Sequence, residues 1–371
     1  MPKYDYIMYN LQVTTITPLH IGSGRDLLRD YDYAVHNNQT WRINEAALLD
    51  AQDVDDPALA DQLAQTPPAQ LLKPGDFRPD SPFFRYVIKG APRSGQEGAQ
   101  LREQLKDPFD RPYIPGSSLK GALRTAIAWH AWEALGLRPD VRKLKENRKG
   151  AAQDYEREIF GRDPNHDLLR ALQVSDSQPV GPDCLMILNA RVLNRNGKAA
   201  SPIALEAIQT RRTFAMTMKL DLALFSDWAR ERGLNLRVEE WLKMLPQVVQ
   251  QHAQDRMQRE AAWFSQARPA FSFYKDWSHE TLEESKFLLQ IGWGTGWEGK
   301  TFGSRLQADK PFMEEIIRKY RLPARGKRQP GDPFPKSRRV MVHVLSTPQG
   351  KTEERPASPL GWVLVEMKEI K

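Results

Sequence analysis

Residues 113–131, YIPGSSLKGALRTAIAWHA, lead the chain out of a turn and into an amphipathic helix. Pro115 and Gly116 break the preceding structure, and Ser117 or Ser118 is expected to cap the first free backbone amides. Apolar residues then recur at helical spacing and define one buried stripe: Leu119, Ala122, Leu123, Ala126 and Ile127. The spacing predicts a core helix that ends near Gly136.

The same helix carries two basic residues, Lys120 and Arg124, which lie on one side because they are four residues apart. A helix N-terminus presents free amides and a partial positive charge, so a lysine one turn inside it suits a phosphate. The spacing of a P-loop is missing. A capped core helix with two solvated basic residues explains the stretch equally well, and the helix alone leaves both interpretations open.

Composition limits the function classes. A chain of 371 residues has room for two domains, and its net charge of +7 favours a polyanionic partner, although many basic proteins bind no nucleic acid. The single cysteine, Cys184, excludes an intramolecular disulfide and a cysteine-based zinc site, and no histidines have metal-ligand spacing, so we expect no cofactor. Without a signal-peptide pattern or a long apolar run, we expect a cytoplasmic protein that contacts no membrane.

The N-terminal third alternates between strand and turn patterns. Residues 4–17 predict a first strand, and the IGSG sequence at 21–24 predicts a glycine loop that could approach a phosphate or form a plain turn. Residues 31–43 predict a hairpin that turns near Asn37 and Asn38. The stretch 64–112 is rich in Pro, Gly and charge and predicts a long insertion with one strand, FFRYVIKG.

The second half of the chain also contains extended, helical and loop patterns. Two adjacent arginines, Arg211 and Arg212, fall in an extended run, where neighbouring side chains point to opposite faces and one could meet a ligand. Residues 237–266 predict the longest helical segment, with a possible kink at Pro246. Residues 321–339 hold seven basic residues and one acidic residue, which fits either an RNA-backbone contact or a solvated loop.

A glycine-rich loop follows the strand pattern FLLQ at 287–290. It contains four glycines, two tryptophans and Lys300 within GWGTGWEGK. Glycines let a backbone come close, tryptophan can stack on a base and lysine can meet a phosphate, so the loop could bind RNA. Tryptophans beside glycines also pack over tight turns, which is the structural alternative.

Four segments together resemble a known family. IPGSSLKG at 114–121, with Arg124, is similar to the signature of the RAMP superfamily of CRISPR-associated proteins. Three further segments resemble the large RAMP subunits that cap type III-A (Csm) effector complexes: TPLHIGSG at 17–24, LQVSDS at 172–177 and GWGTGW at 292–297. Their order and spacing span most of the chain.

This resemblance implies an α+β fold of two ferredoxin-like (RRM-like) RAMP domains with long insertions. The first would cover 1–180 with an insertion at about 64–112, and the second 181–371 with a helical insertion at about 227–268. The implied function is a structural crRNA-binding subunit at the crRNA 3′ end, involved in crRNA maturation and antiviral defence. Implied partners are crRNA, the backbone RAMP and small Csm subunits, and cellular nucleases that trim the 3′ end.

A guide RNA must leave its bases free, so phosphate contacts should dominate its binding. The residues expected to bind RNA come from the glycine loops, the helix start and the arginine pair: Gly22, Ser23, Gly24, Arg25, Ser117, Ser118, Lys120, Arg124, Arg211, Arg212, Gly294, Thr295, Gly296 and Lys300.

Three alternatives stay open. The chain could be a RAMP-type endoribonuclease that processes precursor crRNA or cuts target RNA, with His20 or with Asp26, Asp30 and Asp32 as catalysts. Because the resemblance is to the cap, we expect no catalytic residues and no enzyme. The chain could also be a RAMP subunit of another type III complex, or a general RNA chaperone that binds unrelated RNAs equally well.

Overall fold

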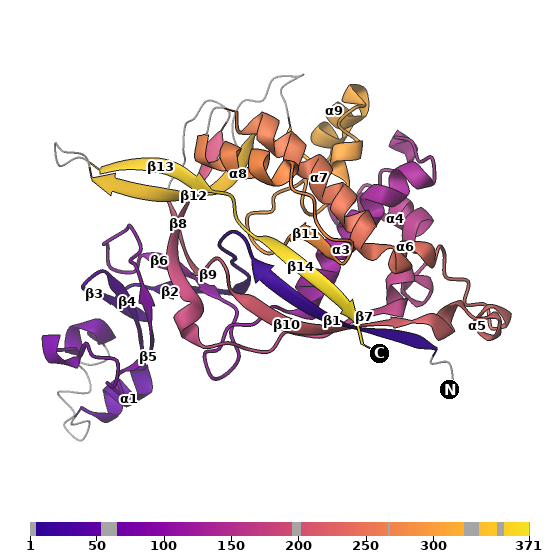
Figure 1. Cartoon of the computed structure of the whole chain (residues 1–371). Helices are drawn as coiled ribbons and strands as arrows, with labels where there is room; N and C mark the ends of the chain where they lie inside the picture. Colours follow the sequence, from indigo (N-terminus) through magenta and orange to yellow (C-terminus); the bar gives the residue numbers. More distant parts are fainter. Residues whose placement is uncertain are drawn as a thin grey trace.

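Two β-sheets and a layer of helices build this mixed α and β fold (Figure 1). The computed structural model describes residues 5–52, 65–194, 202–265, 268–322, 334–346 and 352–370. Most of the basic stretch 321–339 therefore lies outside the described residues. Within the described ranges, no helix is both long and apolar enough to span a membrane.

The first sheet has five antiparallel strands in the order β11-β14-β1-β10-β7. Its central strand β1 confirms the first predicted strand, and its buried residues alternate as the pattern requires. The first and last strands pair antiparallel, so the start of β1 and the end of β14 lie near each other (Figure 1). The strands are β1 (Tyr6–Thr15), β7 (Leu172–Val174), β10 (Thr213–Asp221), β11 (Lys286–Gln290) and β14 (Trp362–Glu369).

Helices cover one face of this sheet (Figure 1). The helix α3 (Gly116–Ala134) confirms the predicted core helix, and it packs against α7, β7 and β11 through the expected apolar stripe. The long segment predicted from 237 divides into α6 (Glu240–Lys243) and α7 (Leu245–Trp263). Pro246 stands in the first turn of α7, where its missing amide costs nothing, so it starts a helix and does not kink one.

The remaining helices surround these two. They are α1 (Glu45–Asp50), α4 (Gln153–Phe160), α5 (Asp227–Glu231), α8 (Arg268–Ser278) and α9 (Lys310–Lys319). Because α7 packs on both α3 and β11, the helical stretch that we assigned to an insertion contributes to the central layer. Burial of α3 and α7 against the sheet forms the main hydrophobic core.

The second sheet has nine strands in the order β2-β6-β9-β8-β5-β4-β3, with β12 joined to β8 and β13 joined to β12. The stretch 64–112 contributes β5 and β6 to this sheet, one strand more than its sequence predicted. The bounds are β2 (Gly22–Leu28), β3 (Tyr33–His36), β4 (Gln39–Ile43), β5 (Phe84–Lys89), β6 (Gln100–Gln104), β8 (Leu185–Asn194), β9 (Ile203–Ile208), β12 (Ser337–Ser346) and β13 (Thr352–Ser358).

The predicted hairpin is confirmed as β3 and β4. Asn37 and Asn38 have φ angles of 49° and 56°, the left-handed backbone of a two-residue hairpin turn. Two other local expectations were wrong. The last three IGSG residues, 22–24, begin the edge strand β2, which pairs with β6 across a register shift between Gly22 and Asp26. Arg211 lies in the turn between β9 and β10, with a φ of 62°, and not in a strand.

Both sheets combine strands from either side of residue 180. The five-stranded sheet joins β1 and β7 to β10, β11 and β14, and the nine-stranded sheet joins β2 to β6 with β8, β9, β12 and β13. Strand pairing between distant parts of the chain therefore brings the segments at residues 19–24, 114–121 and 291–300 close enough to form one site.

Candidate functional site

The start of α3 is fixed by a segment sixty residues further along the chain. The amide of Gly116 donates to Asp176 Oδ1 at 2.8 Å, and the amide of Ile114 donates to Ser177 Oγ at 2.9 Å. A Cβ on Gly116 would lie 2.2 Å from the carbonyl oxygen of Val174. The expected cap by Ser117 or Ser118 was wrong, because the side chain of Asp176 accepts from the first amide of the helix. Both serine hydroxyls therefore have no side-chain partner among the described residues.

The glycine loop after β11 is fastened to the residues before β2. The amide of Trp293 donates to the carbonyl of His20 at 2.7 Å, and the amide of Ile291 donates to the carbonyl of Gly361 at 2.8 Å. Gly292 has a φ of 75° and stands so close to His20 that a Cβ would lie 2.4 Å from its carbonyl oxygen. This glycine allows the two segments to meet.

These contacts create a groove of about 440 Å³ between three of the four family motifs. One wall is the first three turns of α3, another is the start of β2, and the third is the loop after β11. The groove is lined by Ile21, Gly22, Ser117, Ser118, Gly121, Ala122, Thr125, Gln290, Ile291, Gly292, Trp293, Thr295, Gly299 and Lys300.

The groove offers donors and positive charge, and no carboxylate is among the described residues of its lining. Lys300 is exposed and forms no ion pair with any described side chain. The hydroxyls of Ser117 and Ser118 stand at the positively polarised end of a 19-residue helix. This arrangement suits an anion of modest size, such as a phosphate of an extended RNA backbone.

A buried guanidinium lies beneath the groove. Arg256 of α7 is only 4% exposed, donates to Gln290 in the groove lining and stacks over Trp362 at 5.1 Å. Its Nε has no hydrogen-bond partner among the described residues. The nearby carboxylate of Glu260 already binds Arg338 at 2.8 Å, so Arg256 adds positive potential under the groove floor.

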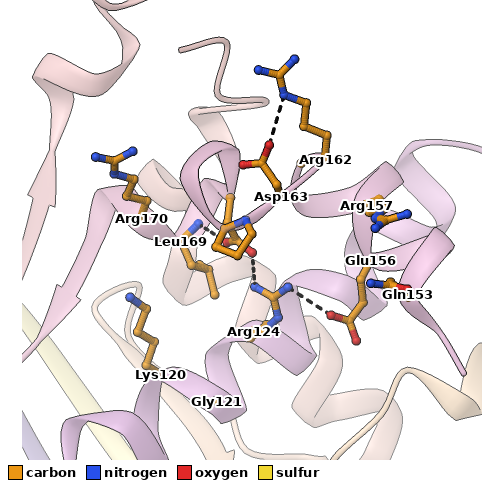
Figure 2. A pocket seen from close by; sticks show the side chains of 13 residues that line it. Lys120, Gly121, Arg124, Gln153, Glu156, Arg157, Arg162, Asp163, Leu169 and Arg170 are labelled. Atoms are coloured by element: carbon orange, nitrogen blue, oxygen red, sulfur yellow. Dashed lines mark hydrogen bonds and ion pairs between the residues drawn. The ribbon is translucent and has the colours of Figure 1, made fainter. Parts of the chain in front are cut away.

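Lys120 and Arg124 line a second pocket of about 550 Å³ on the other side of α3 (Figure 2). Arg124 is already engaged there, because it donates to Asp167 at 2.8 Å and to Glu156 at 3.2 Å and stacks over Phe160 at 3.7 Å. Figure 2 shows Lys120 extending into the pocket separately from these ion pairs. Burial lowers the pKa of Lys120, Asp167 opposes that effect and Arg124 reinforces it.

Most of the other predicted RNA-binding residues lie outside the groove. Ser23 donates to Glu103 at 2.9 Å, and Arg25 pairs with Asp32 at 2.7 Å. Arg212 donates to Gln209 at 2.9 Å. Gly294 and Gly296 have positive φ angles and shape the loop, Gly24 stands on the exposed edge of β2, and Arg211 is exposed in its turn. Thr295 lines the groove, but its hydroxyl donates to the carbonyl of Gly292 at 3.2 Å.

His20, the alternative catalyst, is 3% exposed and holds the loops together. Its Nδ1–H donates to the carbonyl of Glu206 at 2.7 Å, and its ring meets Trp293 edge to face. Burial lowers the pKa of His20 to about 4, and Arg102 and Lys106 add to that effect, although the hydrogen bond opposes it. A histidine of this kind is neutral at pH 7 and is a poor proton donor there.

The three aspartates that follow His20 in the sequence have different surroundings. Asp32 binds Arg25 and the amide of Leu28, Asp30 lies 3.7 Å from Arg29, and Asp26 is exposed on β2. Over the described part of the chain, no group of three His, Cys, Asp or Glu side chains is placed to hold a metal ion.

Sequence inspection missed several groove residues. Gly121, Thr125 and Gln290 line the groove although no motif marked them as ligands. The helical period could have found the first two, because residues 117, 118, 121 and 125 share one face of α3. Trp297 was considered for base stacking, but it packs against Phe334 at 5.1 Å, as the structural alternative predicted.

The chain belongs to the RAMP superfamily, since the model of that family matches residues 12–298. This match confirms the resemblance drawn from the motifs. The chain is similar to the CRISPR system protein Csm5 of Streptococcus thermophilus, with 27% identity over 60% of this chain and 67% of that protein. It is also similar to Csm5 of Methanocaldococcus jannaschii, with 32% identity over 31% of this chain and 28% of the relative.

Solved structures extend the likeness over nearly the whole chain. A chain of the cryo-EM structure of a Csm–crRNA–target RNA ternary complex of a type III-A CRISPR-Cas system matches with a TM-score of 0.69 and 26% identity, covering 97% of this chain and 100% of that one. The crystal structure of Csm5 from T. onnurineus matches with a TM-score of 0.67 and 23% identity, over 95% and 99% of the two chains, and supports the fold.

Proposed function

We propose that this chain is a crRNA-binding structural subunit of a type III-A (Csm) effector complex, where it caps the 3′ end of the crRNA. One observation carries the proposal: three family motifs from distant parts of the chain meet around a groove whose described lining has donors, an unpaired lysine and no carboxylate. The likeness over almost the full length to a chain of a Csm–crRNA–target RNA complex supports the same function.

In this proposal, the groove binds the sugar-phosphate backbone of the RNA. The hydroxyls of Ser117 and Ser118 and the ammonium of Lys300 are the donors for one phosphate, and Gly22 allows the chain to pass closely. Lys120 is proposed as a further phosphate contact, in the pocket across α3. We assign Arg25, Arg124 and Arg212 a smaller part, because their guanidinium groups already bind protein acceptors.

The expected ferredoxin-like architecture remains part of the proposal. The elements β1, α3, β7, β10, α7 and β14 follow a β-α-β-β-α-β succession, and the strand order β14-β1-β10-β7 supports one such unit. A second unit, and a boundary near residue 180, rest on the family resemblance alone. Because this unit joins strands from both sides of residue 180, a chain cut near 180 should stay in one piece under native conditions, and two halves that separate and remain folded would support the expected boundary instead.

A capping subunit needs one surface that binds the last backbone subunit and an opposite surface to which no further backbone subunit can bind. A head-to-tail assembly grows until a subunit lacks the next complementary surface, and the strands built from residues 64–112 would provide that difference. The proposed partners are therefore crRNA, backbone RAMP subunits, small Csm subunits and cellular nucleases that reach the exposed 3′ end, in a cytoplasmic complex.

The rival function is a RAMP-type ribonuclease, and the site geometry favours it less. The pKa of His20 is lowered to about 4 by burial, and its Nδ1–H already donates to a backbone carbonyl. Asp32 is held by Arg25. Cleavage that survives single alanine substitutions of Asp26, Asp30 and Asp32 would support the structural function.

The first experiment is purification of the tagged chain from its host, followed by sequencing of the bound RNA. Repeat-spacer RNAs that share one processed 5′ tag, recovered with other Csm subunits, are the expected result. A chain that brings down arbitrary RNA or none, without Csm subunits, would contradict the proposal, and subunits of a different type III complex would reassign it.

A second experiment tests the groove. Lys300→Ala should remove one phosphate contact, which makes the salt dependence of RNA binding shallower by about 0.7 and weakens binding about 5-fold at 0.1 M salt. Lys275→Ala on α8 is the matched control, because it removes an exposed lysine that does not line the groove. Equal behaviour of the two variants would show that RNA does not use the groove.

A further inference from the structure

Two arginines from different strands lie over one tryptophan at the edge of the groove. The guanidinium carbon of Arg102, on β6, is 5.4 Å from the ring centre of Trp293, and that of Arg339, on β12, is 4.8 Å from it. Both arginines are exposed and Trp293 is half-buried. The ring therefore holds two cations together on the surface.

Neither arginine has an acidic partner among the described side chains, although most arginines nearby do. Arg338, next to Arg339, binds the buried Glu260 at 2.8 Å, because adjacent residues on a strand face opposite sides. Asp26 stands opposite Arg102 in the β2–β6 register but forms no ion pair with it within 4.0 Å. The pair is thus a local excess of positive charge.

The positive charges of the two arginines repel each other. The pKa of Arg339 is lowered by burial and by the charge of Arg102. An anion bound between or beside the two guanidinium groups would relieve this repulsion. Stacking on Trp293 fixes the two groups before any ligand arrives, which lowers the entropy lost on binding.

We propose that Arg102 and Arg339, stacked on Trp293, form a clamp for the phosphodiester backbone of single-stranded RNA that continues out of the groove. Trp293 borders the groove beside Gly22, so an RNA chain that contacts Lys300 reaches the arginine pair by passing over this tryptophan. A planar guanidinium group can donate two parallel hydrogen bonds to two oxygens of one phosphate, which a lysine cannot do. The proposal rests on the proposed function. In it, Trp293 positions the two guanidinium groups and does not stack on a base.

The test measures binding of a fluorescently labelled single-stranded RNA of mixed sequence to the full chain over a range of salt concentrations. Arg102→Ala with Arg339→Ala should make the salt dependence shallower by about 1.4 and weaken binding about 25-fold at 0.1 M salt. Arg102→Lys with Arg339→Lys should keep the slope and lose part of the affinity. The control is Arg142→Ala with Arg230→Ala, two exposed arginines that each bind an acidic neighbour.

The outcomes separate the clamp from the groove. The clamp is supported if the alanine pair loses affinity and slope, the lysine pair keeps the slope, and the control shows no matching change in either. An alanine pair that equals the control, while Lys300→Ala still weakens binding, overturns the clamp alone. A wild-type chain without salt-dependent RNA binding overturns both. Unchanged RNA binding with lost association of neighbouring Csm subunits would show that the arginines contact protein, and would also overturn the clamp.

Discussion

Acid should destabilise this protein through two buried histidines, and His20 gives a clear test. Burial lowers the pKa of His20 from 6.5 to about 4 and that of His252 to about 3. A depressed histidine pKa means that protons bind the unfolded chain more readily, so stability is complete above pH 6.5 and is lost as the pH falls towards 4. Between pH 7 and pH 5, His20 alone should account for a loss of about 2 kcal/mol.

The assay is urea unfolding of the wild type and His20→Gln at pH 7 and pH 5. The difference between the two proteins cancels the titration of other groups, so the substitution should remove about 2 kcal/mol of the pH dependence. His279→Gln is the matched control, because His279 is exposed. If His20→Gln keeps the full pH dependence of the wild type, His20 is not a buried neutral histidine and could still titrate in catalysis.

Two further substitutions test the helix that carries the signature. Gly116→Ala should destabilise the protein by about 3 kcal/mol, because its Cβ would collide with the carbonyl oxygens of Val174 and Ser175, whereas Gly121→Ala on the same helix meets open space and should not; urea midpoints for both decide this. Arg124→Ala should lower stability by about 1–2 kcal/mol through its lost ion pairs and aromatic contact. Lys120→Ala should instead weaken RNA binding at unchanged stability, and a reversed pattern in unfolding and RNA titrations would contradict these assignments.

Local patterns in the sequence predicted the elements well. The alternation in β1, the Asn37–Asn38 turn and the apolar stripe of α3 each depend on residues close in the chain, and all three are confirmed. The resemblance found by comparing four short motifs is confirmed by the family match. These features were predictable because local propensity and burial agree there.

The site depended on contacts that no local pattern contains. Asp176 caps α3 from sixty residues away, so the serines that looked like caps are free to line the groove. Arg124 looked like a phosphate ligand because it shares a helix face with Lys120, but Glu156 and Asp167 fold back onto it. A basic residue can be assigned to RNA only after its acidic neighbours in space are known.

The rule that adjacent arginines on a strand point to opposite faces was sound but was applied to the wrong pair. Arg211 and Arg212 lie in a turn, so strand alternation does not govern them. Arg338 and Arg339 lie on β12, where one binds buried Glu260 and the other stacks on Trp293 at the surface. A pair of this kind places one charge in the core, where it must be neutralised, and leaves the other for a ligand. The arginine that we propose for RNA binding, Arg339, is thus the neighbour of one that the fold already needs.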